Sequence, residues 1–277
     1  MNKIDTNDEN INDADADGFY DLLSRCTGQQ LDPQKDRILL TKPSEGSRNS
    51  KDYLVYCDIN NSRRVALKRC ADIPGFIRRE RITVEAQKAL GFPSYNVIEV
   101  NGITLRNQTT DRNCKILSGW EDKKFLVIDY GNYNAMKVLR LIIPSEICLL
   151  EFFYNYGKFC AFNCLLGVRD RHDKNFVISQ INEMLYSVDN EEGPFDLQDN
   201  LVDIRLIVTQ LKSGIERFFG DDKEPLYKEK LRQGFVDGWR QIAAGLSSLG
   251  MLDEKELDLL RGSIVSDPET IFGQLFY

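Results

Sequence analysis

The sequence predicts an α+β protein of two lobes, in which a β-rich lobe precedes an α-rich one. Two observations support this division. Short apolar runs separated by turn residues fill residues 36–128, and longer runs with the apolar spacing of helices dominate after residue 132. We therefore expect a disordered acidic tail at residues 1–17, an N-lobe with an antiparallel sheet and one helix at 18–131, and a helical C-lobe at 132–277.

Composition and charge narrow the class of protein. A chain of 277 residues with 42% hydrophobic residues can bury a sizeable core. The net charge of −7 argues against a nucleic-acid partner, and no apolar run approaches the roughly 20 residues that span a bilayer. The seven cysteines include no CxxC pair and the chain has one histidine, which argues against a Cys/His zinc site. The odd number of cysteines and the lack of a recognisable signal peptide predict a cytoplasmic protein, and nothing in the sequence indicates its oligomeric state.

The N-lobe is predicted to contain a series of strands and one helix, at 76–90, after a short helix into which the acidic tail leads. We expect helices at 18–26 and 76–90, and strands at 38–42, 53–59, 63–70, 95–100, 103–108 and 123–128. The polar turn between the first two strands contains Gly46 and Ser47, whose backbone N–H groups are suited to bind a phosphate. An ordinary hairpin turn has the same composition, so both interpretations of Ser47 stay open.

The third strand carries a candidate phosphate-binding lysine. Val65-Ala66-Leu67-Lys68 is close to the Val-Ala-Ile-Lys sequence, in which a lysine on a strand pairs with the α- and β-phosphates of a nucleotide. The alternative is a lysine at a solvated strand edge. The position of Lys68, on the third strand of the lobe, favours the first interpretation.

The helix after this strand offers two acids that can hold the lysine. Glu80 and Glu85 are five residues apart, about 140° around a helix, so both cannot face Lys68. Glu80 lies among arginines, which indicates a solvated face, whereas Glu85 shares its face with Ile82 and Ala86. We therefore favour Glu85 and keep Glu80 as the alternative.

The strand at 123–128 is followed by a break that is typical of a hinge. Asp129-Tyr130-Gly131-Asn132 interrupts the apolar pattern between the two lobes. In a two-lobed nucleotide-binding enzyme the backbone groups of such a hinge contact the adenine edge, so Asp129 and Gly131 are candidate nucleotide contacts. A loop after a core strand fits the composition equally well.

The C-lobe is predicted to be helical apart from one hairpin. We expect helices at 135–143, 144–166 with an interruption at Gly157, 198–219, 224–248, 253–262 and 267–275, and hairpin strands at 176–178 and 185–188. The hairpin is expected to present Asp170, Asn175 and Asp189 at one edge. An Asp, an Asn five positions later and a second Asp after the next apolar run recur in phosphoryl transfer, where the first Asp meets the substrate hydroxyl and the other two residues hold metal ions.

These residues resemble a known family. Asp170-Arg171-His172 with Asn175, followed by Val188-Asp189, resembles the catalytic and metal-binding segments of phosphatidylinositol 3-/4-kinase-like enzymes. Those enzymes share the protein-kinase-like fold with actin-fragmin kinase, the HipA toxin kinases and the four-jointed type of secretory-pathway kinase. The resemblance covers about residues 36–200 in element order. It implies a bilobal protein-kinase-like fold and an ATP-dependent kinase that uses ATP and Mg²⁺.

The resemblance also implies roles for individual residues. Asp170 is expected to orient or deprotonate the acceptor hydroxyl, and Asn175 and Asp189 are expected to bind Mg²⁺. Lys68 is expected to hold the phosphates, with Glu85 positioning Lys68.

His172 has two interpretations within the same resemblance. It is either a catalytic base or transition-state stabiliser, for which its near-neutral pKa is suited, or a structural histidine. The chain departs from the family in its poor glycine-rich loop and in Val188-Asp189-Asn190-Glu191, which lacks the phenylalanine and glycine that follow the metal Asp in protein kinases.

The charge pattern after the hairpin bears on the acceptor. Residues 175–204 contain no lysine or arginine and seven acids. This pattern suits a neutral or basic acceptor, and we expect Ser or Thr of a protein substrate. A phosphatidylinositol or small-molecule kinase, and a nucleotide-binding pseudokinase that acts as a binding module, stay as alternatives.

Overall fold

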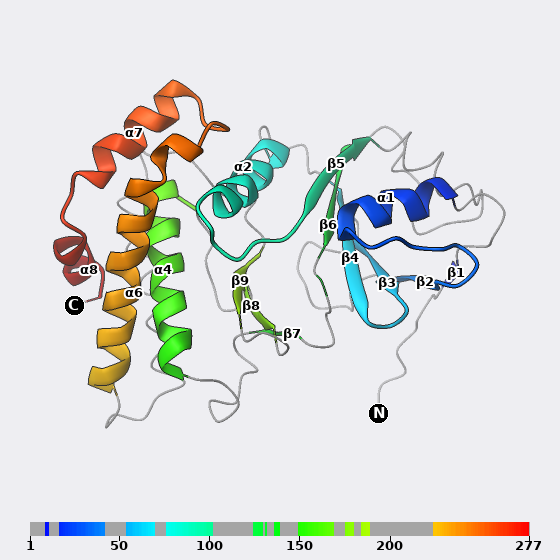
Figure 1. Ribbon diagram of the computed structural model, residues 1–277, viewed down its shortest axis with the longest axis horizontal. Helices are drawn as coiled ribbons and strands as arrows, with labels where there is room; N and C mark the ends of the chain where they lie inside the picture. Colours follow the sequence, from blue (N-terminus) through cyan, green and yellow to red (C-terminus); the bar gives the residue numbers. More distant parts are fainter. Residues whose placement is uncertain are drawn as a thin grey trace. The chain divides into compact units, whose positions relative to one another are not determined.

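The computed structural model describes residues 9–10, 17–41, 54–69, 76–101, 124–129, 131, 136–138, 149–168, 175–179, 184–188 and 224–276. The fold is α+β, with helices and antiparallel strands, as the sequence predicts (Figure 1). The chain divides into two compact units. Unit 1 contains Met1–Ile77 and Tyr95–Ala135, and unit 2 contains Arg78–Ser94 and Met136–Tyr277.

Unit 1 is built on a six-stranded antiparallel sheet in the order β1-β2-β3-β4-β6-β5. Its strands are β1 (Glu9–Asn10), β2 (Ile38–Thr41), β3 (Leu54–Ile59), β4 (Arg63–Arg69), β5 (Val97–Asn101) and β6 (Lys124–Asp129). The five predicted strands among the described residues are confirmed to within two residues at each end. The strand predicted at 103–108 lies outside the described residues.

Local sequence explains the ends of these strands. The turn between β3 and β4 contains Asn60 and Asn61, both with positive φ of 51° and 53°. Asparagine tolerates this conformation better than other residues with a Cβ, and a pair of positive φ values is typical of the type I′ hairpin turn. At the other edge of the sheet, Glu9 and Asn10 pair with Leu40 and Leu39, within the segment predicted to be a disordered tail.

Helix α1 (Asp17–Thr27) covers one face of this sheet (Figure 1). Its apolar residues recur at the spacing of one helix face: Phe19, Leu22, Leu23 and Cys26. They pack with Val65 and Leu67 of β4 and with Val127 of β6. Because side chains alternate along a strand, Ala66 and Lys68 lie on the opposite face of β4.

Unit 2 combines helices with a small sheet. The sheet is antiparallel in the order β7-β8-β9, formed by β7 (Met136–Val138), β8 (Phe176–Ser179) and β9 (Leu185–Ser187). The helices are α2 (Phe76–Ala89), α4 (Leu149–Leu166), α6 (Glu224–Ala244), the 3-10 helix η7 (Leu246–Ser248), α7 (Glu254–Ile264) and α8 (Pro268–Phe276). The predicted hairpin and the predicted helices at 76–90, 253–262 and 267–275 are confirmed.

Two predictions for unit 2 are wrong. Residues 136–138, predicted to be helical, form β7, because their backbone pairs with β8 through Met136–Ser179, Lys137–Ile178 and Val138–Val177. A hydrogen-bonded strand partner overrides helical periodicity in so short a segment. The helix predicted to break at Gly157 continues through it as α4. The predicted helix at 198–219 lies outside the described residues.

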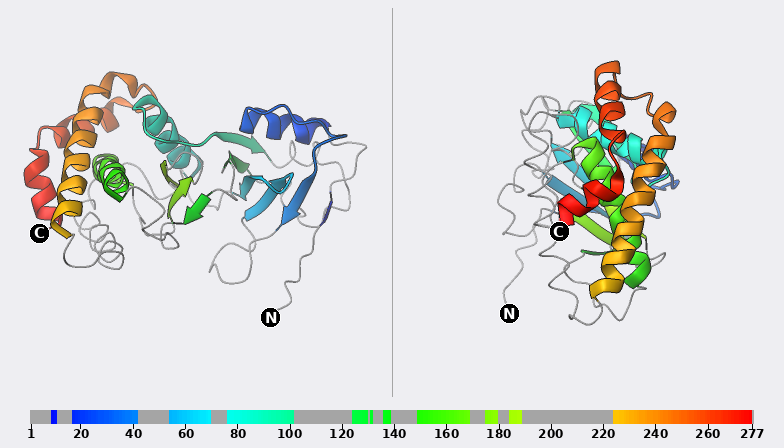
Figure 2. Two further views of the ribbon diagram at one scale, coloured as in Figure 1. Left: turned by 60° about the horizontal axis from the view of Figure 1, so that its bottom comes forward. Right: turned by 90° about the vertical axis from the view of Figure 1, so that its left-hand side faces the viewer.

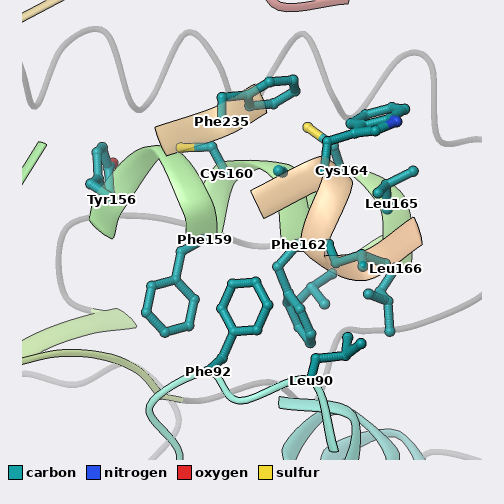
Figure 3. Close-up of a cluster of buried hydrophobic side chains, with 14 of the residues drawn as sticks. Leu90, Phe92, Tyr156, Phe159, Cys160, Phe162, Cys164, Leu165, Leu166 and Phe235 are labelled. Atoms are coloured by element: carbon teal, nitrogen blue, oxygen red, sulfur yellow. The ribbon is translucent and has the colours of Figure 1, made fainter. Parts of the chain in front are cut away.

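The core of unit 2 surrounds α4. Figure 3 shows its aromatic side chains meeting those of neighbouring segments, with Phe92 beside Phe159 and Phe162. The ring centroids of Phe92 lie 5.5 Å and 5.1 Å from those of the two other rings. Cys160 and Cys164 are free thiols in the same core, and burial raises the pKa of Cys164 to about 12, so both behave as small apolar residues.

Helices α4 and α6 lie side by side with their backbones in direct contact (Figure 1, Figure 2). A Cβ built on Gly157 would lie 2.1 Å from the carbonyl oxygen of Leu231, and one built on Gly234 would lie 1.9 Å from the carbonyl oxygen of Tyr154. Gly157 therefore lets α6 approach α4, which explains why a glycine inside α4 does not interrupt it. Next to this contact, the Tyr154 hydroxyl donates to Asp237 Oδ2 at 3.0 Å.

Helix α2 packs on the core of unit 2 with one of its faces. Ile82, Ala86 and Leu90 belong to the same buried cluster as Phe159 and Phe162. From sequence we assigned this helix to the N-lobe, whereas packing groups residues 78–94 with the helices of unit 2. The lobe boundaries stay a prediction.

Among the described residues, none of the helices combines the length and the apolar character that crossing a bilayer requires.

The α4–α6 contact predicts a strong effect of a single methyl group. Gly234→Ala places a Cβ against a backbone oxygen that cannot move away, so the free energy of unfolding should fall by at least about 2 kcal/mol. Gly262→Ala on α7 is the matched control, because a Cβ at Gly262 meets nothing within 4 Å. Urea unfolding of both variants measures the difference, and equal midpoints would contradict the close helix contact.

Candidate functional site

Lys68, the candidate phosphate-binding residue, lies on the central part of the unit 1 sheet. Strand β4 is hydrogen-bonded on both sides, with Lys68 opposite Leu54 of β3 and opposite Leu126 of β6. The side chain is half-buried on the face away from α1. Ala66 and Leu126 are completely buried. Lys68 therefore does not occupy a solvated edge strand, which was the alternative interpretation of this residue.

The start of the predicted hinge is held by a polar network within unit 1. Asp129, at the end of β6, is buried. Its Oδ1 accepts a hydrogen bond from Arg63 Nε at 3.0 Å, and its Oδ2 accepts one from Arg63 Nη2. The same Asp129 Oδ1 accepts from the Gly131 N–H at 2.8 Å. Arg63 Nη2 also donates to the carbonyl oxygen of Thr27 at the end of α1, at 2.8 Å. The network thus joins the ends of α1 and β6 to the start of β4.

The Asp129 carboxylate and the Gly131 backbone therefore form hydrogen bonds within unit 1. Gly131 has a φ of +66°, a backbone conformation that glycine adopts more easily than other residues. Its carbonyl oxygen accepts a hydrogen bond from the Arg64 N–H at 2.9 Å. Its N–H and C=O thus both have hydrogen-bond partners in unit 1. The assignment of Asp129 and Gly131 as nucleotide contacts stays a prediction, and the geometry gives both residues a structural use.

The hairpin of unit 2 brings Asn175 next to the end of β9. Strands β8 and β9 pair from Phe176–Ser187 to Ile178–Leu185, and the Val188 N–H donates to the Asn175 carbonyl oxygen at 2.9 Å. Asn175 is 3% exposed. Asp189 follows Val188 directly in the sequence.

Several predicted site residues lie outside the described residues: Ser47, Asp170, His172 and Asp189. Their assignments stay predictions. Among the residues that the structure does describe, no group of three or more His, Cys, Asp and Glu side chains is arranged to hold a metal ion.

The two candidate acids on α2 have very different surroundings. Glu80 is 0% exposed, so the expectation that it lies on a solvated face is wrong. The Glu85 side chain is 44% exposed, and its Oε1 lies 3.4 Å from Arg81 Nη2, one helical turn away. A buried carboxylate requires a cation or hydrogen-bond donors, whereas an exposed i, i+4 pair contributes little. Glu80 therefore depends on partners within the protein, whereas Glu85 does not.

The buried face of α2 that contains Glu80 is polar. Thr83 and Gln87 follow at helical spacing, and both are 0% exposed. Within the described part of the chain, Thr83 Oγ1 and both amide atoms of Gln87 have no hydrogen-bond partner. The spacing of Glu80, Thr83 and Gln87 is visible in the sequence and was not recognised as a buried polar stripe.

The predicted site residues are divided between the two units. Lys68, Asp129 and Gly131 belong to unit 1, and Glu80, Glu85 and Asn175 belong to unit 2. Within unit 1, the pairing of β4 with β6 brings Lys68 and Asp129 onto neighbouring strands. Sequence analysis missed Arg63, since its partner is 66 residues away and no local pattern indicates the pair.

The Arg63–Asp129 network predicts a loss of stability when the cation is removed. Arg63→Gln leaves a buried carboxylate with one fewer charged partner, and we expect the free energy of unfolding to fall by about 2–3 kcal/mol. Lys35→Gln removes an exposed surface pair with Asp32 and should leave the unfolding midpoint unchanged. Thermal and urea unfolding check this, and equal effects of the two substitutions would show that Asp129 does not depend on Arg63.

No protein-family model matches the chain, and no curated protein matches it. Among solved structures, the chain is similar to the crystal structure of a Helicobacter pylori proinflammatory kinase, CtkA. The TM-score is 0.39 and the identity is 9%, over 80% of this chain and 94% of that chain.

Proposed function

We propose that the protein is an ATP-dependent kinase that transfers the γ-phosphate of ATP to a hydroxyl group. The observation that supports this best is the register of the β8–β9 hairpin. The Val188 N–H···Asn175 carbonyl bond at 2.9 Å sets Asn175 beside the residue that precedes Asp189. Asp189 follows Val188 directly in the sequence, fourteen residues after Asn175.

The donor groups of this pair suit Mg²⁺. An asparagine amide oxygen and a carboxylate are hard oxygen ligands, which Mg²⁺ prefers, and it is usually held by one or two protein groups together with substrate phosphates. Asn175 and Asp189 would hold the ion, which would neutralise charge on the nucleotide phosphates. Asp170 would accept the proton of the attacking hydroxyl. The hydroxyl oxygen would form a bond to the γ-phosphorus while the bond between that phosphorus and ADP breaks. His172 is kept as an alternative base.

Lys68 is the proposed phosphate ligand of unit 1. Lys68 is attached to a central strand, so the backbone that carries its side chain is rigid. This matters because positioning is the main contribution of a protein to phosphoryl transfer. We propose Glu80 rather than Glu85 as the acid that orients Lys68, because only Glu80 is enclosed by protein. Asp129 and Gly131 would shape the hinge through their mutual bond, and Ser47 stays a candidate phosphate contact.

The proposed acceptor is Ser or Thr of a protein. Residues 175–204 carry seven acids and no lysine or arginine, which would repel an inositol phosphate head group and attract basic residues around a hydroxyl. Phosphatidylinositol and small molecules are the alternative acceptors, and a pseudokinase that binds ATP without turnover is the alternative of a different class.

Transfer of label from γ-labelled ATP tests the kinase activity. Wild type with Mg²⁺ should phosphorylate a basic Ser/Thr peptide library, and EDTA should abolish the transfer. Asp189→Ala should lower turnover at least about a hundredfold, since it removes a metal ligand. Asp21→Asn, an exposed acid on α1, is the control with unchanged turnover. ATP binding without turnover in wild type would indicate a pseudokinase, and label on phosphatidylinositol vesicles alone would change the acceptor.

A second experiment separates the two acids of α2. Glu80→Gln keeps the shape of the side chain and removes its charge, so turnover should fall about tenfold or more through poor orientation of Lys68. Glu85→Gln should stay within about twofold of wild type, because the exposed Arg81 pair has little effect. Circular dichroism confirms that both variants are folded. The opposite result, a loss in Glu85→Gln alone, would restore the assignment favoured by the sequence.

A further inference from the structure

Helix α2 is attached to the C-terminal helices of unit 2 through a charged pair. Arg78, in the first turn of α2, donates to Glu256 of α7 through Nη1 to Oε1 at 2.6 Å and through Nη2 to Oε2 at 2.9 Å. The two residues are 178 positions apart. A guanidinium that contacts both oxygens of a carboxylate fixes the relative orientation of the two groups as well as their distance.

Glu256 is itself held in place by α7. It is the third residue of the helix and forms a capping box with Asp253, in which the Asp253 N–H donates to Glu256 Oε2 at 2.9 Å and the Glu256 N–H donates to Asp253 Oδ1 at 2.9 Å. The Glu256 side chain is 9% exposed, whereas that of Arg78 is 50% exposed. The carboxylate is therefore a fixed, nearly buried anchor, and the arginine is the more mobile partner.

The other end of α2 is held by α6. Gln241 Nε2 donates to the carbonyl oxygen of Leu90, just after the end of α2. A Cβ built on Gly245 would lie 2.4 Å from Leu90 Cδ2, so the Leu90 side chain packs directly on the end of α6. Between these two points, Ile82 and Ala86 pack in the core of unit 2.

We infer that Arg78 and Glu256 are positioning residues, through which α7 sets the orientation of α2 and thereby of Glu80. This inference rests on the proposed function, in which Glu80 orients Lys68. Glu80 lies two residues after Arg78, within the same first turns of the helix, so a shift of the first turn displaces it directly. The C-terminal helices, to which the sequence resemblance does not extend, thus support the site through α2.

The expected consequence of losing the pair is a kinetic change with little loss of stability. Arg78 is half exposed, so its pair with Glu256 contributes only modestly to the free energy of unfolding. A displaced Glu80 would orient Lys68 poorly in the transition state and would lower kcat about tenfold while KM for ATP stays within about twofold.

Five variants of the full chain test the inference: two single substitutions of the pair, their combination, Arg78→Lys and a control. Arg78→Gln removes the guanidinium that donates to both oxygens of Glu256. Glu256→Gln removes the anionic partner and keeps a side chain that can complete the capping box. Arg81→Gln, which removes the exposed pair with Glu85 on the same helix, is the matched control. Amide hydrogen exchange across residues 78–89, kcat and KM for ATP are measured for each variant and for wild type.

The first two variants should show at least about fivefold faster exchange in α2 and the loss in kcat, and the double variant should lose no more than either single one. Arg78→Lys keeps the positive charge but loses the two-point contact with the carboxylate, so its kcat should lie between those of Arg78→Gln and wild type. Unchanged exchange in α2 would overturn the attachment, and faster exchange with unchanged kcat would overturn the positioning role. If wild type shows no turnover, the proposed function fails and the positioning role with it, while the exchange data alone decide the attachment.

Discussion

The contact between α4 and α6 is the constraint on which unit 2 depends. Two backbones can touch only where side chains are absent, and Gly157 and Gly234 provide this at facing positions. Once α6 occupies one side of α4, the remaining faces of α4 direct aromatic rings toward other elements. Phe159 meets Phe92 after α2 and also Phe176 of β8, so the same helix supports both the helix with the buried glutamate and the hairpin with Asn175.

The segment after residue 224 is part of this core and not an addition to it. Phe235 and Phe272 belong to the same buried cluster as the residues of α4, and Trp239 Nε1 donates to the carbonyl oxygen of Ile264. Through α6 and α7 the segment also reaches both ends of α2. The proposed kinase site therefore depends on helices that no sequence motif links to it, because packing transmits position between elements that are distant in sequence.

Polar residues at predicted site positions have two possible uses, and the structure distinguishes them for some. Asp129 satisfies Arg63 and the Gly131 N–H, so its oxygens serve the fold. Asn175 accepts the Val188 N–H with its backbone carbonyl oxygen, so its backbone serves the hairpin. A buried polar group is stable only with partners. The partners of a group, more than its residue type, therefore indicate whether it serves folding or chemistry.

The sequence by itself determined most elements of this protein, since helix and strand periodicity and the Asn60-Asn61 turn act within a few residues. It also determined that Lys68 lies on a strand and that Asn175 begins a hairpin. Only the tertiary structure decided that residues 136–138 form a strand, that Glu80 is buried, and that α7 holds α2. In each of these cases the deciding neighbour lies elsewhere along the chain, as in the 178-residue separation of the Arg78–Glu256 pair, and local patterns contain no information about such a neighbour.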